Sequence, residues 1–207
     1  MIISHKYKFI FIAVPKTGTT SIRNFLKPYF DIFPNLDLKS PQYVHTNIKT
    51  LKQHFKNKNW NFDEYFKFGF VRNPWDRAVS EYHYKINYVD RENLNKPYYK
   101  PFMSQCKLIK KINNFNKAVT LNLLNGVNQS SYILDDNQKN LMNFIGKFEN
   151  LNEDFKFICR KIGAEENNLP HENKSVHRHY KEYYNQESIQ FIQEKFKQDI
   201  ETFDYKF

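Results

Sequence analysis

Two short apolar segments stand out in the pattern of hydrophobic and polar positions. Residues 9–14 (FIFIAV) are consecutively apolar, and residues 65–71 (YFKFGFV) alternate in part between apolar and polar side chains. Both have the length of a β-strand. After the first, apolar side chains recur at helical spacing at Ile22, Phe25 and Leu26. The pattern therefore predicts a strand, a tight loop and a helix in direct succession.

The same criteria predict the remaining elements. A third strand is expected at 143–149, and long polar loops at 31–44, 90–101 and 164–176. Helices are expected at 48–55, 102–111, 115–125, 155–162 and 189–200. Strands that alternate with helices predict an α/β fold with a central, mainly parallel sheet. Such sheets bind ligands beyond the carboxyl ends of their strands.

Length and composition limit the class of protein. The 207 residues fit one domain, 1–207, and 40% hydrophobic with 17% aromatic residues excludes wholesale disorder. A net charge of +10 predicts anionic partners, such as a nucleotide cofactor, an acidic glycan or a nucleic acid. No apolar stretch is long enough to cross a bilayer. The two cysteines have no metal-cluster spacing and suit a reducing compartment, so we expect no metal and a cytoplasmic location.

The first expected strand runs directly into a loop suited to an anion. This loop reads Pro15-Lys16-Thr17-Gly18-Thr19-Thr20-Ser21. A helix N-terminus carries partial positive charge and unpaired N–H groups, and Gly18 lets the backbone approach a ligand closely. Lys16 adds a charge, and the threonines add hydroxyl donors. A nucleoside-triphosphate P-loop is excluded, since Lys16 precedes the segment's only glycine. A plain strand-to-helix turn stays the structural alternative.

The second strand ends in a comparable arrangement at residues 72–82. Asn73 suits a helix N-cap and Pro74 the first helical turn, so Ser80 would lie about two turns inside that helix. Arg72 stands at the end of the strand, and its planar guanidinium suits phosphate oxygens. The alternative is that Arg72, with the charged residues after it, forms a solvated cluster.

Taken together, the two stretches resemble the sulfotransferases that use 3′-phosphoadenosine 5′-phosphosulfate (PAPS). Residues 15–21 are similar to that family's 5′-phosphosulfate loop, and residues 70–80 to its 3′-phosphate motif. Residues 148–151 (FENL), 169–171 (LPH) and 199–207 resemble its carbohydrate branch, which includes heparan and chondroitin sulfotransferases. The resemblance implies a P-loop-like three-layer α/β/α sulfotransferase fold. It also implies transfer of a sulfuryl group from PAPS to a hydroxyl, without a metal.

The resemblance also implies roles for individual residues. Lys16 would contact the phosphosulfate and its bridging oxygen, and Thr17 to Ser21 would wrap the 5′ phosphate. Arg72 and Ser80 would hold the 3′ phosphate. A late loop at 171–178 would close over the cofactor through Lys174, Ser175 and Arg178.

In-line transfer requires a general base for the acceptor hydroxyl, and histidine suits that role because its pKa is near neutral. His45 is preferred, because it follows a loop and precedes a helix, where similar enzymes place a histidine. His171, His177 and His179 are the other candidates; structurally they would form a basic surface cluster.

Two other function classes fit part of the pattern. Another nucleotide-dependent transferase, such as a kinase, would share the sheet, but Arg72 and Ser80 suit only a 3′-phosphorylated nucleotide. A non-catalytic basic protein that binds nucleotides or nucleic acid would cluster its basic residues, whereas the lysines here are dispersed along the chain. We therefore expect no nucleic-acid partner. The expected acceptor is a carbohydrate or another hydroxyl-bearing molecule, and the basic composition favours an anionic one. The sequence does not indicate the oligomeric state.

Overall fold

The computed structural model describes residues 1–32, 43–89, 100–124, 126–166, 169 and 178–207. Contacts between Cα atoms divide the chain into two compact units. The first unit holds the described residues of 1–72 and 128–173, and the second holds those of 73–127 and 174–207. The single domain expected from the length stays a prediction.

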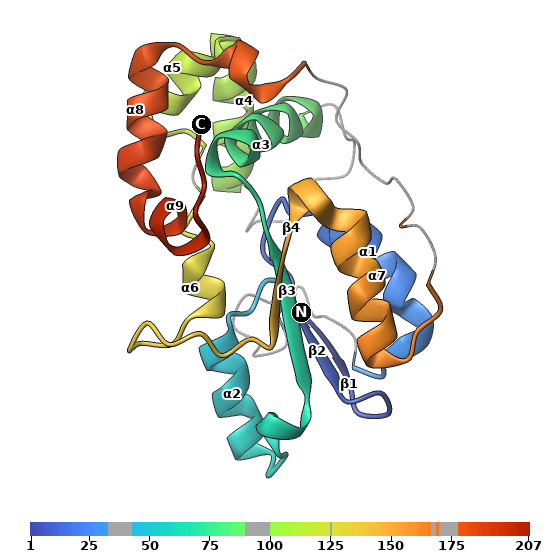
Figure 1. The fold of residues 1–207 in the computed structure, drawn as a ribbon. Coiled ribbons are helices and arrows are strands. Elements are labelled where there is room, and N and C mark those ends of the chain that lie inside the picture. Colours follow the sequence, from blue (N-terminus) through green and yellow to red (C-terminus); the bar gives the residue numbers. More distant parts are fainter. Residues whose placement is uncertain (33–42, 90–99, 125, 167–168, 170–177) are drawn as a thin grey trace. The chain divides into compact units, whose positions relative to one another are not determined.

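The first unit is built on a sheet whose strands, among the described residues, lie in the order β1-β2-β3-β4 (Figure 1). These strands are β1 (Ile2–Ser4), β2 (Phe9–Ile12), β3 (Phe66–Val71) and β4 (Phe144–Lys147). β1 pairs antiparallel with β2, whereas β2 with β3 and β3 with β4 pair parallel. This mainly parallel α/β sheet confirms the fold class predicted from the sequence. β1 was not predicted, because three residues are too few to show a period.

Helices cover both sides of this sheet, as is typical of parallel sheets. α1 (Thr19–Leu26) and α7 (Leu151–Ile162) pack on one face, and α2 (Ile48–Asn57) lies on the other side (Figure 1). The first unit also contains α6 (Ser130–Ile133) and the 3₁₀ helices η1 (Lys27–Tyr29), η2 (Phe62–Glu64) and η4 (Phe148–Asn150). Gly163, at φ 68°, ends α7 where the sequence predicted.

The core beneath α1 and α7 is aromatic. Phe11 stacks on Phe68 with ring centroids 5.3 Å apart, and both are fully buried against Ile22 and Phe155. Alternate residues of a strand point to opposite faces of the sheet. Phe11 and Phe68 both point to the face that α1 and α7 cover. Because β2 and β3 are adjacent and parallel, the loops that follow them leave the sheet at the same edge.

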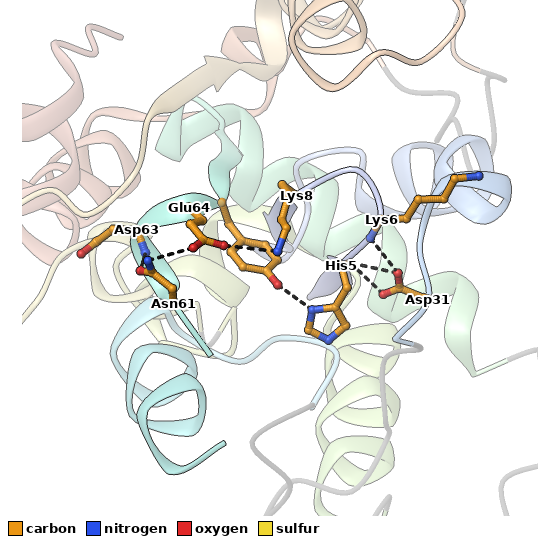
Figure 2. A network of polar contacts seen from close by, with 8 residues as sticks. His5, Lys6, Lys8, Asp31, Asn61, Asp63 and Glu64 are labelled. Atoms are coloured by element: carbon orange, nitrogen blue, oxygen red, sulfur yellow. Dashed lines mark hydrogen bonds and ion pairs between the residues drawn. The ribbon is translucent and has the colours of Figure 1, made fainter. Parts of the chain in front are cut away.

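A polar network stabilises the turn between β1 and β2, at the edge of the sheet opposite to the carboxyl ends of β2 and β3 (Figure 2). The backbone amides of His5 and Lys6 donate to the Asp31 carboxylate, the former at 2.9 Å. Lys8 pairs with Glu64 at 3.3 Å. These contacts tie the turn to the segment after η1 and to η2, at the amino end of β2, away from the loop that follows it.

The second unit is helical in its described residues. It contains α3 (Pro74–Tyr88), α4 (Lys100–Ile112), α5 (Phe115–Thr120), η5 (Tyr180–Tyr183), α8 (Gln186–Lys195) and α9 (Lys197–Phe203). The helix expected at 115–125 is shorter, because Asn122 takes a left-handed φ of 55°. The final helix expected over 189–200 is two helices, since Phe196 leaves helical dihedrals (φ −110°, ψ 26°).

Candidate active site

The loop between β2 and α1 is held in a specific backbone conformation. Lys16 has φ 70°, and Gly18 has φ 76°. A left-handed φ at a lysine costs about 1 kcal/mol, and such strain clusters at functional sites. The buried Thr17 hydroxyl donates to the Val14 carbonyl at 2.9 Å, so it stabilises the loop from within.

Gly18 is also the N-cap of α1. Within the described residues, no side chain caps this helix and its first turn holds no carboxylate. A Cβ added to Gly18 would lie 3.1 Å from Leu151 Cδ2 and 3.3 Å from Phe148 Cε2, in addition to the strain of its positive φ. The loop can thus pack tightly on η4 and α7 only with glycine here. Thr19 is the first residue of α1, and the partial positive charge at a helix N-terminus attracts anions.

Arg72 lies beside this loop, because β2 and β3 are adjacent and parallel and end at the same edge of the sheet. Its Nη1 donates to the carbonyl of Lys16 at 3.2 Å, and its guanidinium carbon lies 4.1 Å from the ring centroid of Phe148. The structure therefore brings together Lys16, Gly18 and Arg72, two of which are cations. Together with the helix N-terminus, this donor set suits phosphate or sulfate oxygens.

His45 lies against the start of the same loop. Its Nδ1 is 2.6 Å from the carbonyl oxygen of Ala13, the residue that follows β2. A carbonyl can only accept, so Nδ1 carries the proton and Nε2 of the neutral ring keeps its lone pair. Burial lowers the pKa of His45 from 6.5 to about 4, the Ala13 carbonyl opposes this, and the charge of Arg23 adds to the lowering. His45 is therefore neutral near pH 7 and can accept a proton through Nε2.

Ser80 belongs to the second unit. The side chain of Asn73 caps α3 by accepting from the amides of Trp75 and Asp76, at 3.0 and 3.5 Å, and Pro74 is the first helical residue. Both positions are as the sequence predicted. Ser80 is buried within α3.

The late-loop residues of the sequence analysis are mostly outside the described part of the chain: Lys174, Ser175, His171 and His177. His179 caps η5 and accepts from the amide of Lys181 at 3.4 Å. Arg178 pairs with Glu182 at 3.5 Å on the surface of the second unit. Sequence reasoning assigned no site role to Phe148, although its ring contacts both Gly18 and Arg72. The signal in the sequence was its place in the segment 148–151 (FENL), which resembles the carbohydrate branch.

Among the residues that the structure describes, no three His, Cys, Asp or Glu side chains come together as metal ligands would. In that same part of the chain, no helix combines the length and the apolar character needed to cross a membrane.

Comparison with known proteins gives the family. A family model described as "Sulfotransferase family" matches residues 1–206. An uncharacterized protein of Archaeoglobus fulgidus is 33% identical over 107 residues, which are 51% of this chain and 73% of that protein. Mouse carbohydrate sulfotransferase 14 is 27% identical over 90 residues, 43% of this chain and only 24% of that protein.

A solved structure, mouse sulfotransferase SULT7A1 complexed with PAP, aligns over 96% of this chain and 85% of its own, with 17% identity and a TM-score of 0.47. The family model spans nearly all of the sequence, including residues 15–21 and 70–80. The chain therefore belongs to the sulfotransferase family, whose members are enzymes that transfer sulfuryl groups.

Proposed function

We propose that this sulfotransferase takes the sulfuryl group from PAPS and passes it to a hydroxyl of a carbohydrate, with His45 as general base. One observation carries the choice of base: the Nδ1–H of His45 is bonded to Ala13, at the start of the anion loop. This contact fixes the ring and leaves Nε2 as the proton acceptor.

Lys16 and the N-terminus of α1 are proposed to hold the phosphosulfate end of the donor. PAPS, when bound, supplies an activated sulfuryl group on a phosphate leaving group. Lys16 and the first amides of α1 would stabilise the negative charge that grows on the departing oxygen. Arg72 would bind the 3′ phosphate. The role of Ser80 at the 3′ phosphate, and those of Lys174 and Ser175 in a loop that closes over the cofactor, stay predictions from the sequence.

His45 would act on the acceptor. As the acceptor oxygen bonds to sulfur and the bond from sulfur to the phosphate oxygen breaks, the hydroxyl proton passes to Nε2 of His45. The low pKa of His45 keeps the ring neutral, and hence able to accept, at physiological pH. Anionic groups bound at Lys16 would raise that pKa and strengthen the base, because negative charge favours the imidazolium.

The carbohydrate acceptor is supported by the similarity to carbohydrate sulfotransferase 14 and by the net charge. That similarity covers 43% of this chain. A charge of +10 favours an acidic saccharide over a neutral one.

Calorimetric titration with 3′-phosphoadenosine 5′-phosphate (PAP) and with AMP tests the donor site. We expect PAP to bind with micromolar affinity, about −8 kcal/mol, and AMP much more weakly. Arg72→Ala should remove that preference. Arg160→Ala is the matched control, because Arg160 is an exposed arginine of the same unit that pairs with Glu166. Equal affinity for both nucleotides would instead favour another nucleotide-dependent transferase. If neither nucleotide binds, the result would favour a non-catalytic basic protein.

Sulfuryl transfer from PAPS to a set of acidic and neutral glycans tests the acceptor and the base. His45→Ala should lose turnover and keep its affinity for PAP. Unchanged turnover in this variant would remove His45 from the reaction, and transfer only to non-carbohydrate hydroxyls would refute the proposed acceptor.

A further inference from the structure

The backbone of Arg72 is held by one buried side chain. The amide of Arg72 donates to Gln129 Oε1 at 2.8 Å, and Gln129 Nε2 donates back to the Arg72 carbonyl at 2.8 Å. Gln129 is fully buried. Its carboxamide thus satisfies both peptide groups of the residue at which β3 leaves the sheet. Because both bonds are short and shielded from water, Arg72 is fixed in position along the strand axis.

The guanidinium of Arg72 is held separately. It lies over the face of Phe148 at 4.1 Å and donates to the Lys16 carbonyl at 3.2 Å. The Phe148 ring also packs beneath Gly18, where an added Cβ would lie 3.3 Å from Cε2. One aromatic ring therefore contacts both the loop after β2 and the arginine after β3.

Holding an arginine at both ends has a consequence for anion binding. A free arginine loses the freedom of several rotatable bonds when it binds a phosphate, and that loss weakens binding. Arg72 has already given up much of this freedom in folding. A nucleotide that uses Arg72 would gain affinity from this preorganisation, and one that does not use Arg72 would gain nothing.

We propose that Gln129 and Phe148 are positioning residues for recognition of the 3′ phosphate: Gln129 fixes the backbone of Arg72, and Phe148 fixes its guanidinium. This inference rests on the proposed function, in which Arg72 binds that phosphate. It also gives a role to the start of the FENL segment, residues 148–151.

The test compares the affinities for PAP and AMP, which differ only in the 3′ phosphate. In Gln129→Met, which keeps the length of the side chain and removes both hydrogen bonds, the preference for PAP should fall by about fivefold. In Phe148→Leu it should fall by about threefold, since the aromatic face is lost. Phe148→Tyr keeps that face and should keep the preference. The readout is the ratio of the two affinities, because damage to the loop at Lys16 and Gly18 would weaken PAP and AMP equally.

A control variant for the strand itself is Asn143→Ala. At the other end of β3, Asn143 Oδ1 accepts from the amide of Lys67 at 2.8 Å, a contact of the same kind as that of Gln129 but remote from Arg72. It should keep the preference for PAP.

The outcomes separate this inference from the proposed function. A wild type without preference for PAP refutes the proposed site, and the inference with it. A wild type that prefers PAP, with variants that keep the preference or lose PAP and AMP affinity equally, refutes the inference alone. If Gln129→Met does not fold, the comparison of Phe148→Leu with Phe148→Tyr still tests whether the aromatic ring positions the guanidinium of Arg72.

Discussion

Acidification should destabilise this protein through His45, and His45→Gln should remove that part of the effect. Burial lowers the pKa of His45 from 6.5 to about 4. Between these values the unfolded chain binds a proton that the folded chain does not bind. Stability therefore rises with pH in this window and is lost as the pH falls below about 6.5. Glutamine can still donate to the Ala13 carbonyl but does not titrate.

The magnitude follows from the two pKa values. The full lowering corresponds to about 3 kcal/mol, which would be lost once the pH is below 4. Between pH 7.5 and pH 5 the loss due to His45 should be about 2 kcal/mol. This is a large fraction of the stability of a typical domain, about 5–15 kcal/mol.

Urea unfolding at pH 7.5 and at pH 5, followed by tryptophan fluorescence, measures this difference. The wild type should lose about 2 kcal/mol more than His45→Gln over this pH range. Groups that titrate in the same range independently of His45 contribute equally to both proteins and cancel. An equal loss in the two proteins would show that His45 is not held neutral by the fold, and would weaken its assignment as the base.

Three further predictions concern the second unit and the thiols. Asn73→Ala removes the N-cap of α3 and should lower the free energy of unfolding by about 1 kcal/mol in chemical denaturation; no change would mean that the cap is dispensable. Asp199→Asn removes the carboxylate that lies 3.7 Å from Arg77 in a buried pair, and should cost about 3 kcal/mol, measured in the same way; a loss below about 1 kcal/mol would contradict a buried pair. Burial raises the pKa of Cys106 and Cys159 to about 11, so a thiol reagent at pH 8 should label them only after unfolding, and rapid labelling of the native protein would refute their burial.

Much of the local structure could be predicted from the sequence. The apolar run before Pro15, the cap at Asn73 and the glycine at 163 each act within a few residues, and the structure has β2, α3 and the end of α7 where they predict. Helix length was less predictable, as at α5. It ends at Thr120 because Asn122 adopts a left-handed conformation, which apolar spacing does not report.

The sequence predicted where the residues of the candidate site lie along the chain, but not which of them contact one another. Sequence alone determined that a tight loop with Lys16 and Gly18 follows the first predicted strand and that an arginine follows the second, because short-range patterns set those positions. Only the tertiary structure decided that Arg72 reaches the carbonyl of Lys16, that Gln129 holds its backbone, and that His45 bonds to Ala13 across 32 residues. These contacts depend on which strands become neighbours and on how side chains distant in sequence fill the space between them. No local pattern carries that information, because the packing energy that selects such contacts is shared by the whole fold.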